Sequence, residues 1–184
     1  MYKIKLYGLG GQGVVTAAGI LSHAVSIYEM KYAKTVPAYG HERRGAPVFS
    51  DVMVDDKPIL LNSFVYEPDI VIVFDASVME KGIDIGKGIH EKTLLVINTD
   101  QDDVLTRVKE KYSFQRIYYV NATKIAVENI GRNIPNGPML GALVNTGIVE
   151  IDSIKKSLAE FFKQKGGEKN VKAAEQAYQK TNRI

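Results

Sequence analysis

The chain has 184 residues, no cysteine and a formal net charge of +3, from 24 basic and 21 acidic side chains. This length suits a single domain, residues 1–184, that can bury a sufficient hydrophobic core without disulfides or a structural metal. Without cysteine the chain forms no disulfide and cannot ligate an iron–sulfur cluster through thiolates. The near-balanced charge does not suggest nucleic acid as a partner. No run of 18 apolar residues occurs, and residues 2–5 lack the apolar core of a signal peptide, so we expect no membrane partner and a cytoplasmic location.

A glycine-rich turn joins the first strand-like segment, residues 2–7, to the first helix-like segment, residues 14–28. Gly8, Gly10 and Gly13 form the arrangement G-x-G-x-x-G, in which missing Cβ atoms allow positive φ and let a phosphate approach the backbone. The helix that follows would offer free N–H groups and the positive end of its dipole. The sequence therefore predicts a Rossmann-like start. The candidate ligand-binding residues of this turn are Gly8, Gly10, Gly11, Gln12 and Gly13.

A short second strand, predicted over residues 31–36, tests whether the turn binds a dinucleotide. Dinucleotide-binding folds place an acidic residue at the end of this strand, where it binds the ribose hydroxyls. Thr35 and Val36 offer none, and Glu29 lies before the strand. The sequence therefore disfavours NAD, for which G-x-G-x-x-G alone is weak evidence.

A polar loop rich in proline, glycine and charge follows at residues 37–47. Its composition is too polar for a core and too rigid for a linker, so we expect a shaped loop. Guanidinium groups held in such a loop can bind carboxylate or phosphate through two hydrogen bonds. Ion pairs that only fix the loop are the open alternative. The candidate residues here are Tyr39, Gly40, Glu42, Arg43 and Arg44.

The middle of the chain alternates strands and helices. The strand-like segments are residues 48–54, 58–61, 69–75, 93–98 and 116–120, the first two joined as a hairpin at the sheet edge. Helical patterns cover residues 101–111 and 122–131. This alternation predicts a three-layer α/β/α fold with a mostly parallel sheet and an edge hairpin. On this architecture ligands bind at the carboxyl ends of the strands.

The last part of the chain predicts a helical C-terminal tail. Residues 136–149 leave so little polar face that either the domain itself or a partner chain must cover them. Residues 151–162 predict an amphipathic helix, and a polar helix begins near Asn170 after a pair of glycines. The tail is either an arm or a packing helix.

Catalytic groups are hard to find in this sequence. His23, His41 and His90 are scattered, without metal-ligand spacing or a nucleophile elbow. We expect His23 to pack between helices and His41 to be a solvated loop residue. No pair of residues resembles an acid/base pair. We therefore expect no catalytic residue and no metal ligand in this chain.

Five motifs, taken in order, make the chain similar to the γ subunits of the 2-oxoacid:ferredoxin oxidoreductase family. They are G-x-G-G-Q-G-V from Gly8, P-x-x-G-x-E-R-R-G-A-P-V from Pro37, Lys57-Pro58-Ile59, Pro68-Asp69, and the run from Asn136 to Ala142. Together they cover nearly the whole chain. Residues 42–47 resemble the pyruvate/2-oxoisovalerate type, whereas the 2-oxoglutarate type tends to have a Gly-Gly pair after the arginine.

The resemblance implies one subunit of a complex that converts a 2-oxoacid, most simply pyruvate, and coenzyme A to acyl-CoA and CO2 while reducing ferredoxin. In that family thiamine diphosphate and Mg²⁺ lie between the α and β subunits, [4Fe–4S] clusters lie in the β and δ chains, and the γ chain completes the assembly. The implied partners are α, β and δ subunits, coenzyme A, and ferredoxin as the acceptor of the complex. The γ chain would bind no metal. Its glycine turn and residues 39–44 would hold coenzyme A phosphates or seal the thiamine site.

Two other interpretations stay open at this point. A free-standing nucleotide-binding protein would use the glycine turn by itself, although no acidic residue follows Val36. A purely structural interface subunit would use the glycines for tight packing between helix and sheet, and the charged loop for docking to a neighbouring chain.

Overall fold

A computed structural model describes residues 1–38, 44–163 and 166–184, and these form one sheet of order β2-β3-β1-β4-β5-β6-β7. The strands are β1 (Tyr2–Leu9), β2 (Tyr32–Pro37), β3 (Pro47–Asp55), β4 (Ile70–Val73), β5 (Leu94–Asn98), β6 (Arg116–Val120) and β7 (Asn182–Arg183). The α-helices are α1 (Val14–His23), α2 (Asp102–Lys111), α3 (Ala122–Ile130), α4 (Asn136–Leu143), α5 (Ile151–Phe162) and α6 (Gly167–Lys180). A π-helical turn, η1 (Ala24–Tyr28), extends α1, and short 3₁₀ turns, η2 (Ala76–Val78) and η3 (Val144–Thr146), follow β4 and α4.

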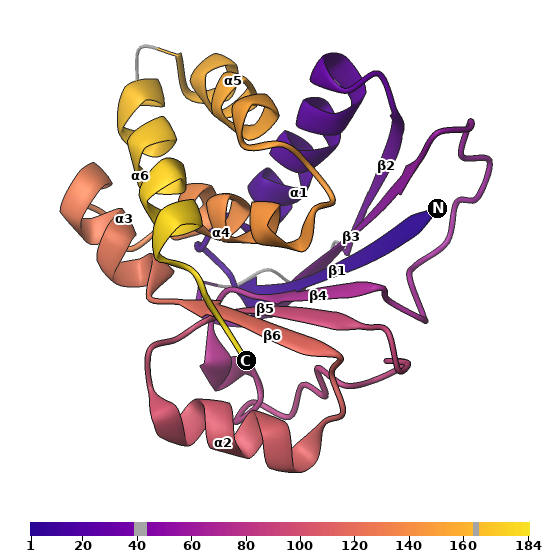
Figure 1. Cartoon of the computed structure of the whole chain (residues 1–184), viewed down its shortest axis with the longest axis vertical. Helices are drawn as coiled ribbons and strands as arrows, with labels where there is room; N and C mark the ends of the chain where they lie inside the picture. The colour runs from indigo at the N-terminus through magenta and orange to yellow at the C-terminus, as the bar shows by residue number, and fades with distance from the viewer. Residues whose placement is uncertain (39–43, 164–165) are drawn as a thin grey trace.

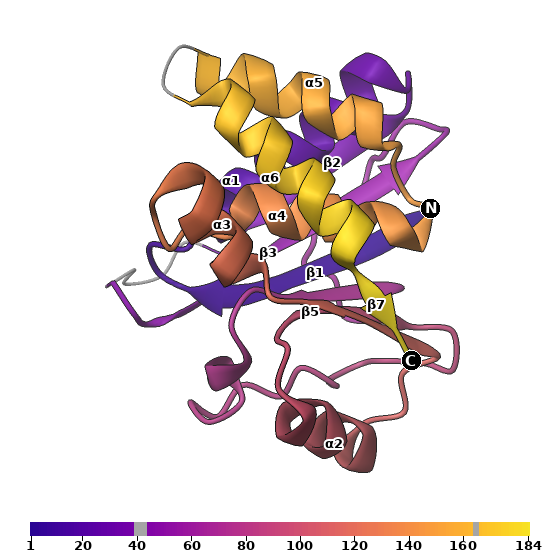
Figure 2. The same cartoon turned by 60° about the vertical axis from the view of Figure 1, so that its left-hand side comes forward.

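The sheet lies between two layers of unequal thickness (Figure 1, Figure 2). Helices α1, α3, α4, α5 and α6 cover one face, whereas α2 and the loops near it cover the other. The core is divided in the same way. Leu6 and Ile72 join the cluster under the larger helical layer, while Val71 and Val73 join the cluster under α2. All of β4 is buried because successive side chains enter opposite clusters. The three-layer α/β/α prediction is confirmed.

The central strands β1, β4, β5 and β6 are parallel neighbours, and antiparallel strands flank them on both sides. An edge hairpin exists, but the expected pairing of residues 48–54 with 58–61 is wrong. Strand β3 pairs with β1 along one edge and with β2 along the other, and residues 58–61 form no strand. Both edges of β3 are thus already occupied, so β2 and β3 make the hairpin instead.

The place of β2 bears on the glycine turn. In a dinucleotide-binding fold the second strand is a parallel neighbour of the first, so its carboxyl end lies beside the turn. Here β2 is antiparallel to β3, which separates it from β1. The strand that would carry the ribose-binding acid therefore does not adjoin β1. β1, the glycine turn and α1 follow one another as in a Rossmann fold. β2, however, does not lie where the second strand of that fold lies, because it is not next to β1.

Helix α4 lies at the centre of the larger helical layer. All of Asn136–Leu143 is buried, and α4 contacts α1, α3, α5 and α6. Helix α6 crosses it closely at Gly141, where a Cβ would overlap the carbonyl oxygen of Ala174. The apolar segment is thus covered by this chain itself. The C-terminal tail is a packing element, because α5 and α6 pack together and β7 pairs with β6.

We expect Gly141→Ala to lower the free energy of unfolding by about 1–3 kcal/mol, the usual cost of overpacking. The added methyl group would force α4 and α6 apart. Gly19→Ala in α1 is the control, because a Cβ there meets nothing within 4 Å. It should stabilise the helix by roughly 0.5–1 kcal/mol. Urea denaturation of both variants measures the difference, and equal effects would contradict the close crossing of the two helices.

Candidate functional site

The glycine turn lies at the carboxyl end of β1 and leads directly into α1. Gly11 and Gly13 have φ of 96° and 76°, in the left-handed region that glycine enters without strain. Gly13 also precedes the first residue of α1, and a Cβ on it would lie 2.7 Å from Nδ2 of Asn136. Gly8 is part of β1, and its Cβ would collide with Val14 at 2.6 Å. The turn therefore needs glycine for clearance as well as for conformation.

Gln12 fixes the turn with both ends of its side-chain amide. Its Oε1 accepts a hydrogen bond from the backbone N–H of Leu9 at 2.8 Å, and its Nε2 donates to Oδ2 of Asp75 at 2.7 Å. Asp75 follows β4, and its Oδ1 accepts the N–H of Ser77 at 3.0 Å. Gln12 thus ties the turn to the carboxyl end of the neighbouring parallel strand.

The start of β3 lies against the same turn. The N–H of Gly10 donates to the carbonyl of Ala46 at 2.8 Å, and the N–H of Gly45 donates to the carbonyl of Gly10 at 3.1 Å. The exposed side chain of Arg44 passes beside Gly11, 3.6 Å from where a Cβ would stand. The two sequence motifs therefore meet at Arg44. Tyr39, Gly40, His41, Glu42 and Arg43 lie outside the described residues.

An open groove of about 440 Å³ borders the turn and the N-terminus of α1. The turn and the first residues of α1 form one wall, and the apolar side chains of Val48, Ile134 and Phe162 line the groove with them. Within the described part of the chain, no side chain caps α1. The N–H groups of the first turn of an α-helix have no intrahelical acceptor, and together with the helix dipole they favour an anion.

Two polar residues at this site, Asp75 and Asn136, were not predicted as site residues. Asn136 is only 3 % exposed, lines the groove, and its Oδ1 accepts the N–H of Gly137 at 2.8 Å. Asp75 comes just after a buried strand, and this position is a signal for the carboxyl edge of a sheet. The sequence does not show that β4 is the neighbour of β1, however, and this neighbourhood is what brings Asp75 to Gln12.

The next parallel strands are tied together at the same edge. Asn98, the last residue of β5, donates from Nδ2 to the carbonyl of Phe74 and to Oγ1 of Thr123, both at 2.8 Å. The N–H of Thr123 donates back to Oδ1 of Asn98 at 3.2 Å. These bonds fix the loop ends of β4, β5 and β6 relative to one another. The edge that carries the glycine turn is therefore a hydrogen-bonded rim.

His23 packs between helices, as the sequence predicts. Its Nδ1 lies 3.0 Å from Oγ of Ser157, and its Nε2 lies 3.4 Å from Oε2 of Glu160. A hydrogen bond to Glu160 also raises the pKa of Tyr28.

Among the residues that the structure describes, no three His, Asp or Glu side chains could hold a metal ion together. None of the described helices is long and apolar enough to cross a bilayer.

The sequence model of the pyruvate ferredoxin/flavodoxin oxidoreductase family matches residues 3–180. The chain belongs to this family. It is 42 % identical to the pyruvate/ketoisovalerate oxidoreductases common subunit gamma of Pyrococcus abyssi, over 98 % of this chain and 97 % of that one. It is 45 % identical to the pyruvate synthase subunit PorC of Methanocaldococcus jannaschii, over 97 % and 96 %. The resemblance found in the five motifs is thereby confirmed along the whole chain.

The solved structures of family members agree with this fold. The crystal structure of the pyruvate oxidoreductase subunit PORC of Thermotoga maritima matches with a TM-score of 0.84 at 34 % identity, covering 99 % of this chain and 97 % of that one. The fold also matches 30 % of a chain of the 2-oxoglutarate:ferredoxin oxidoreductase of Magnetococcus marinus, with a TM-score of 0.73. At 17 % identity that match shows the fold alone.

We expect Gln12→Glu to destabilise the chain by about 1–3 kcal/mol at neutral pH, because it places a second carboxylate against Asp75. Close like charges raise the pKa of one carboxyl in the folded state. Such a group favours the folded state at low pH and loses that stability as the pH rises through its raised pKa. The deficit should therefore shrink as the pH falls towards about 4, the ordinary pKa of a carboxyl group.

The control for Gln12→Glu exchanges the amide of residue 12 with the carboxylate of residue 75. Gln12→Glu combined with Asp75→Asn again sets one amide against one carboxylate, so it should recover most of the lost stability at neutral pH. Urea denaturation between pH 4 and pH 8 compares the variants. A double variant no more stable than the single one would show that the contact does not hold the turn.

We expect Gly13→Ala to cost more stability than Gly131→Ala. The two glycines have nearly the same φ, 76° and 78°, so both variants share a left-handed penalty of about 1–2 kcal/mol. A Cβ at position 131 meets nothing within 4 Å, whereas at position 13 it would press on Asn136. Thermal and urea denaturation measure the difference. Equal losses would mean that Asn136 yields freely and does not support the turn.

Proposed function

We propose that this chain is the γ subunit of a 2-oxoacid:ferredoxin oxidoreductase that acts on pyruvate. The observation that carries the proposal is the end-to-end similarity to subunits named for pyruvate/ketoisovalerate oxidoreductases and pyruvate synthase. The complex would couple the oxidative decarboxylation of pyruvate, dependent on coenzyme A, to the reduction of ferredoxin. In this proposal residues 1–184 act as one γ domain of a cytoplasmic complex with α, β and δ subunits.

The proposal assigns the bond-breaking chemistry to the partner chains. Thiamine diphosphate, Mg²⁺ and the [4Fe–4S] clusters would be held by the α, β and δ subunits, and this chain has no cysteine with which to ligate a cluster. In such enzymes cofactors carry the difficult steps, and protein chains bind and orient the substrates. The role of this chain would be of the second kind.

We assign the phosphates of coenzyme A to the groove beside the glycine turn. The uncapped start of α1 borders the groove, and the side chain of Arg44 passes beside Gly11 of the same turn. Helix N–H groups and a guanidinium both favour an anion. Val48 and Phe162 in the same groove suit the less polar pantetheine part. When bound, coenzyme A supplies the thiol that takes up the acyl group. The proposed binding set is Gly8, Gly10, Gly11, Gln12, Gly13, Tyr39, Gly40, Glu42, Arg43 and Arg44, with Gln12 positioning the turn.

A second candidate function is that of a structural subunit without a ligand of its own. Two observations favour it: the glycines have packing reasons of their own, at Val14 and Asn136, and both ends of the Gln12 amide are hydrogen-bonded within the chain. A free-standing nucleotide-binding protein is disfavoured, because β2 is separated from β1. Coenzyme A dependence distinguishes the two subunit roles.

In the complex reconstituted with its partner subunits, we expect Arg44→Ala to raise the KM for coenzyme A at least tenfold and leave the KM for pyruvate unchanged. The lost interaction of a guanidinium with a phosphate is worth about 1.5–3 kcal/mol, and about 1.4 kcal/mol corresponds to a factor of ten. The assay is the reduction of a low-potential dye, dependent on pyruvate and coenzyme A.

Arg107→Ala is the matched control for Arg44→Ala. Arg107 is an exposed arginine of α2 that pairs with Asp103 and Glu80, away from the groove. It should leave both KM values unchanged. An Arg44→Ala complex that assembles and keeps the coenzyme A dependence of the wild type would favour the structural role. A wild-type chain that elutes alone and supports no dye reduction would refute the γ-subunit proposal itself.

A further inference from the structure

The connection between β3 and β4 presents large apolar side chains to solvent. Residues 58–66, which we call the apolar arm, contain no Asp, Glu, Lys, Arg or His. Leu60 is 91 % exposed and Tyr66 72 %, and Leu61 and Phe64 are 50 % and 40 % exposed. In Figure 1 this connection runs along the outer edge of the molecule, away from the larger helical layer. Contiguous exposed apolar patches mark interaction sites.

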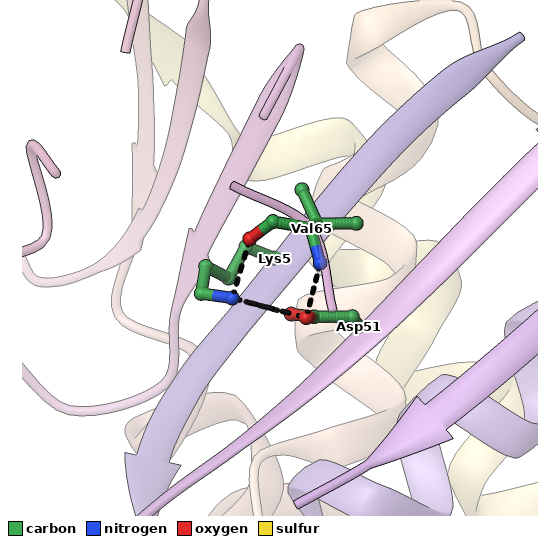
Figure 3. Close-up of polar contacts among 3 residues, drawn as sticks. All are labelled: Lys5, Asp51 and Val65. Atoms are coloured by element: carbon green, nitrogen blue, oxygen red, sulfur yellow. Dashed lines mark hydrogen bonds and ion pairs between the residues drawn. The ribbon is translucent and has the colours of Figure 1, made fainter. Parts of the chain in front are cut away.

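A buried ion pair fixes the arm to the sheet near its end. Lys5 of β1 donates to both carboxylate oxygens of Asp51 in β3, at 2.8 and 3.0 Å, and to the carbonyl of Val65 at 2.9 Å (Figure 3). The N–H of Val65 donates to the same carboxylate at 2.7 Å, and Asp51 is completely buried. The three donor positions of the ammonium are thus all used. The network needs no ligand, and its effect is to hold the arm at Val65.

The rest of the arm is fixed to the domain by far fewer hydrogen bonds. Between residues 58 and 64 the backbone makes no hydrogen bond to any other described residue, and no helix or strand forms there. Ordering such a segment costs about 1–2 kcal/mol per residue in conformational entropy. The side chain of Leu60 does not offset this cost in the isolated chain, because it stays in solvent, and that of Leu61 does so only in part, because it is half exposed.

An apolar groove of about 450 Å³ lies beside the arm. Tyr7 and Phe49 of the sheet line it together with Phe64 and Tyr66 of the arm, and the rings of Phe49 and Phe64 pack edge to face with centroids 5.7 Å apart. Burial, followed by the charge of Asp51, raises the pKa of Tyr7 to about 12. The lining of the groove also includes the charged residues Lys5, Asp84 and Lys87. The aromatic part of the groove is continuous with the arm through Phe64 and Tyr66, which belong to both.

We propose that the apolar arm, with the aromatic side chains of the groove beside it, is the docking surface for an apolar, uncharged face of another subunit of the oxidoreductase. This inference rests on the proposed function, which supplies the partner chain. The neutrality of the arm matches a partner face without charge and offers nothing to a polyanion. The relatives of this chain are named as subunits of oxidoreductases, so a partner chain other than a second copy is at hand for this surface.

The test is the assembly of the complex with Leu60→Asp. A charge at this position leaves the isolated chain folded, because Leu60 is 91 % exposed, but it must be desolvated in the interface. We expect association with the partner subunits to weaken at least tenfold, as measured by analytical ultracentrifugation, with dye-reducing activity recovered at high partner concentration. Leu61→Asp should act in the same direction. Thermal unfolding of the isolated variants checks that the fold is intact.

Met30→Asp is the matched control. Met30 is 85 % exposed and has φ of 56°, a conformation that Asp tolerates, and it lies before β2, outside the arm and its groove. It should assemble as the wild type does. Assembly of Leu60→Asp with unchanged affinity would overturn the inference. So would an isolated wild-type chain that is a dimer and that Leu60→Asp converts to a monomer, because the occupant would then be a second copy. If neither the wild type nor Met30→Asp assembles, the proposed function fails, and the inference with it.

Discussion

The passage of the chain from β1 into α1 is the constraint on which the rest of the structure depends. β1 is paired on both edges, with β3 and β4, so its carboxyl end is enclosed by neighbours on either side. The backbone turns there in little space. A Cβ at position 8 would collide with Val14 and one at position 13 with Asn136, so only glycine fits at both positions. Gln12 then ties the turn to Asp75 and Gly10 ties it to Ala46. The same bonds that make the turn possible bring the two sequence motifs together.

The sequence predicts those elements whose patterns are local. The β-branched run of β4 and the apolar run of β5 are found within one or two residues, because strands buried on both faces are apolar without interruption. Helices α2, α3 and α5 are found for the corresponding reason, a 3.6-residue period. The α/β class and its layers follow from the alternation of these elements.

Strand order is what the sequence does not show. Residues 58–61 look like the return strand of a hairpin, but β2 pairs with that edge of β3. The two-residue period of a strand does not show which other strand it pairs with. The same limit hides the contact between Gln12 and Asp75, which depends on β4 lying next to β1. Helix α4 is apolar on nearly all sides, and in this chain α6 covers it. Its sequence pattern would be the same if a partner chain covered it instead. Side-chain roles of this kind are properties of the packed molecule.

The two faces of the sheet suggest different tasks within one complex. The groove at the glycine turn is bordered by the first residues of α1 and by apolar side chains, and Arg44 passes beside Gly11 of the same turn; this is where we propose that an anionic ligand binds. The arm on the other side of β1 and β3 is uncharged and suits another protein. Strands β1 and β3 carry both, since β1 ends in the turn and Lys5 and Asp51 anchor the arm.

A structure of the assembled complex with coenzyme A bound decides whether the groove beside the glycine turn holds this ligand. We expect phosphate oxygens within hydrogen-bond distance of the first N–H groups of α1 and of the Arg44 guanidinium. Coenzyme A held entirely by other chains, with partner side chains filling the groove beside the glycine turn, would contradict this expectation.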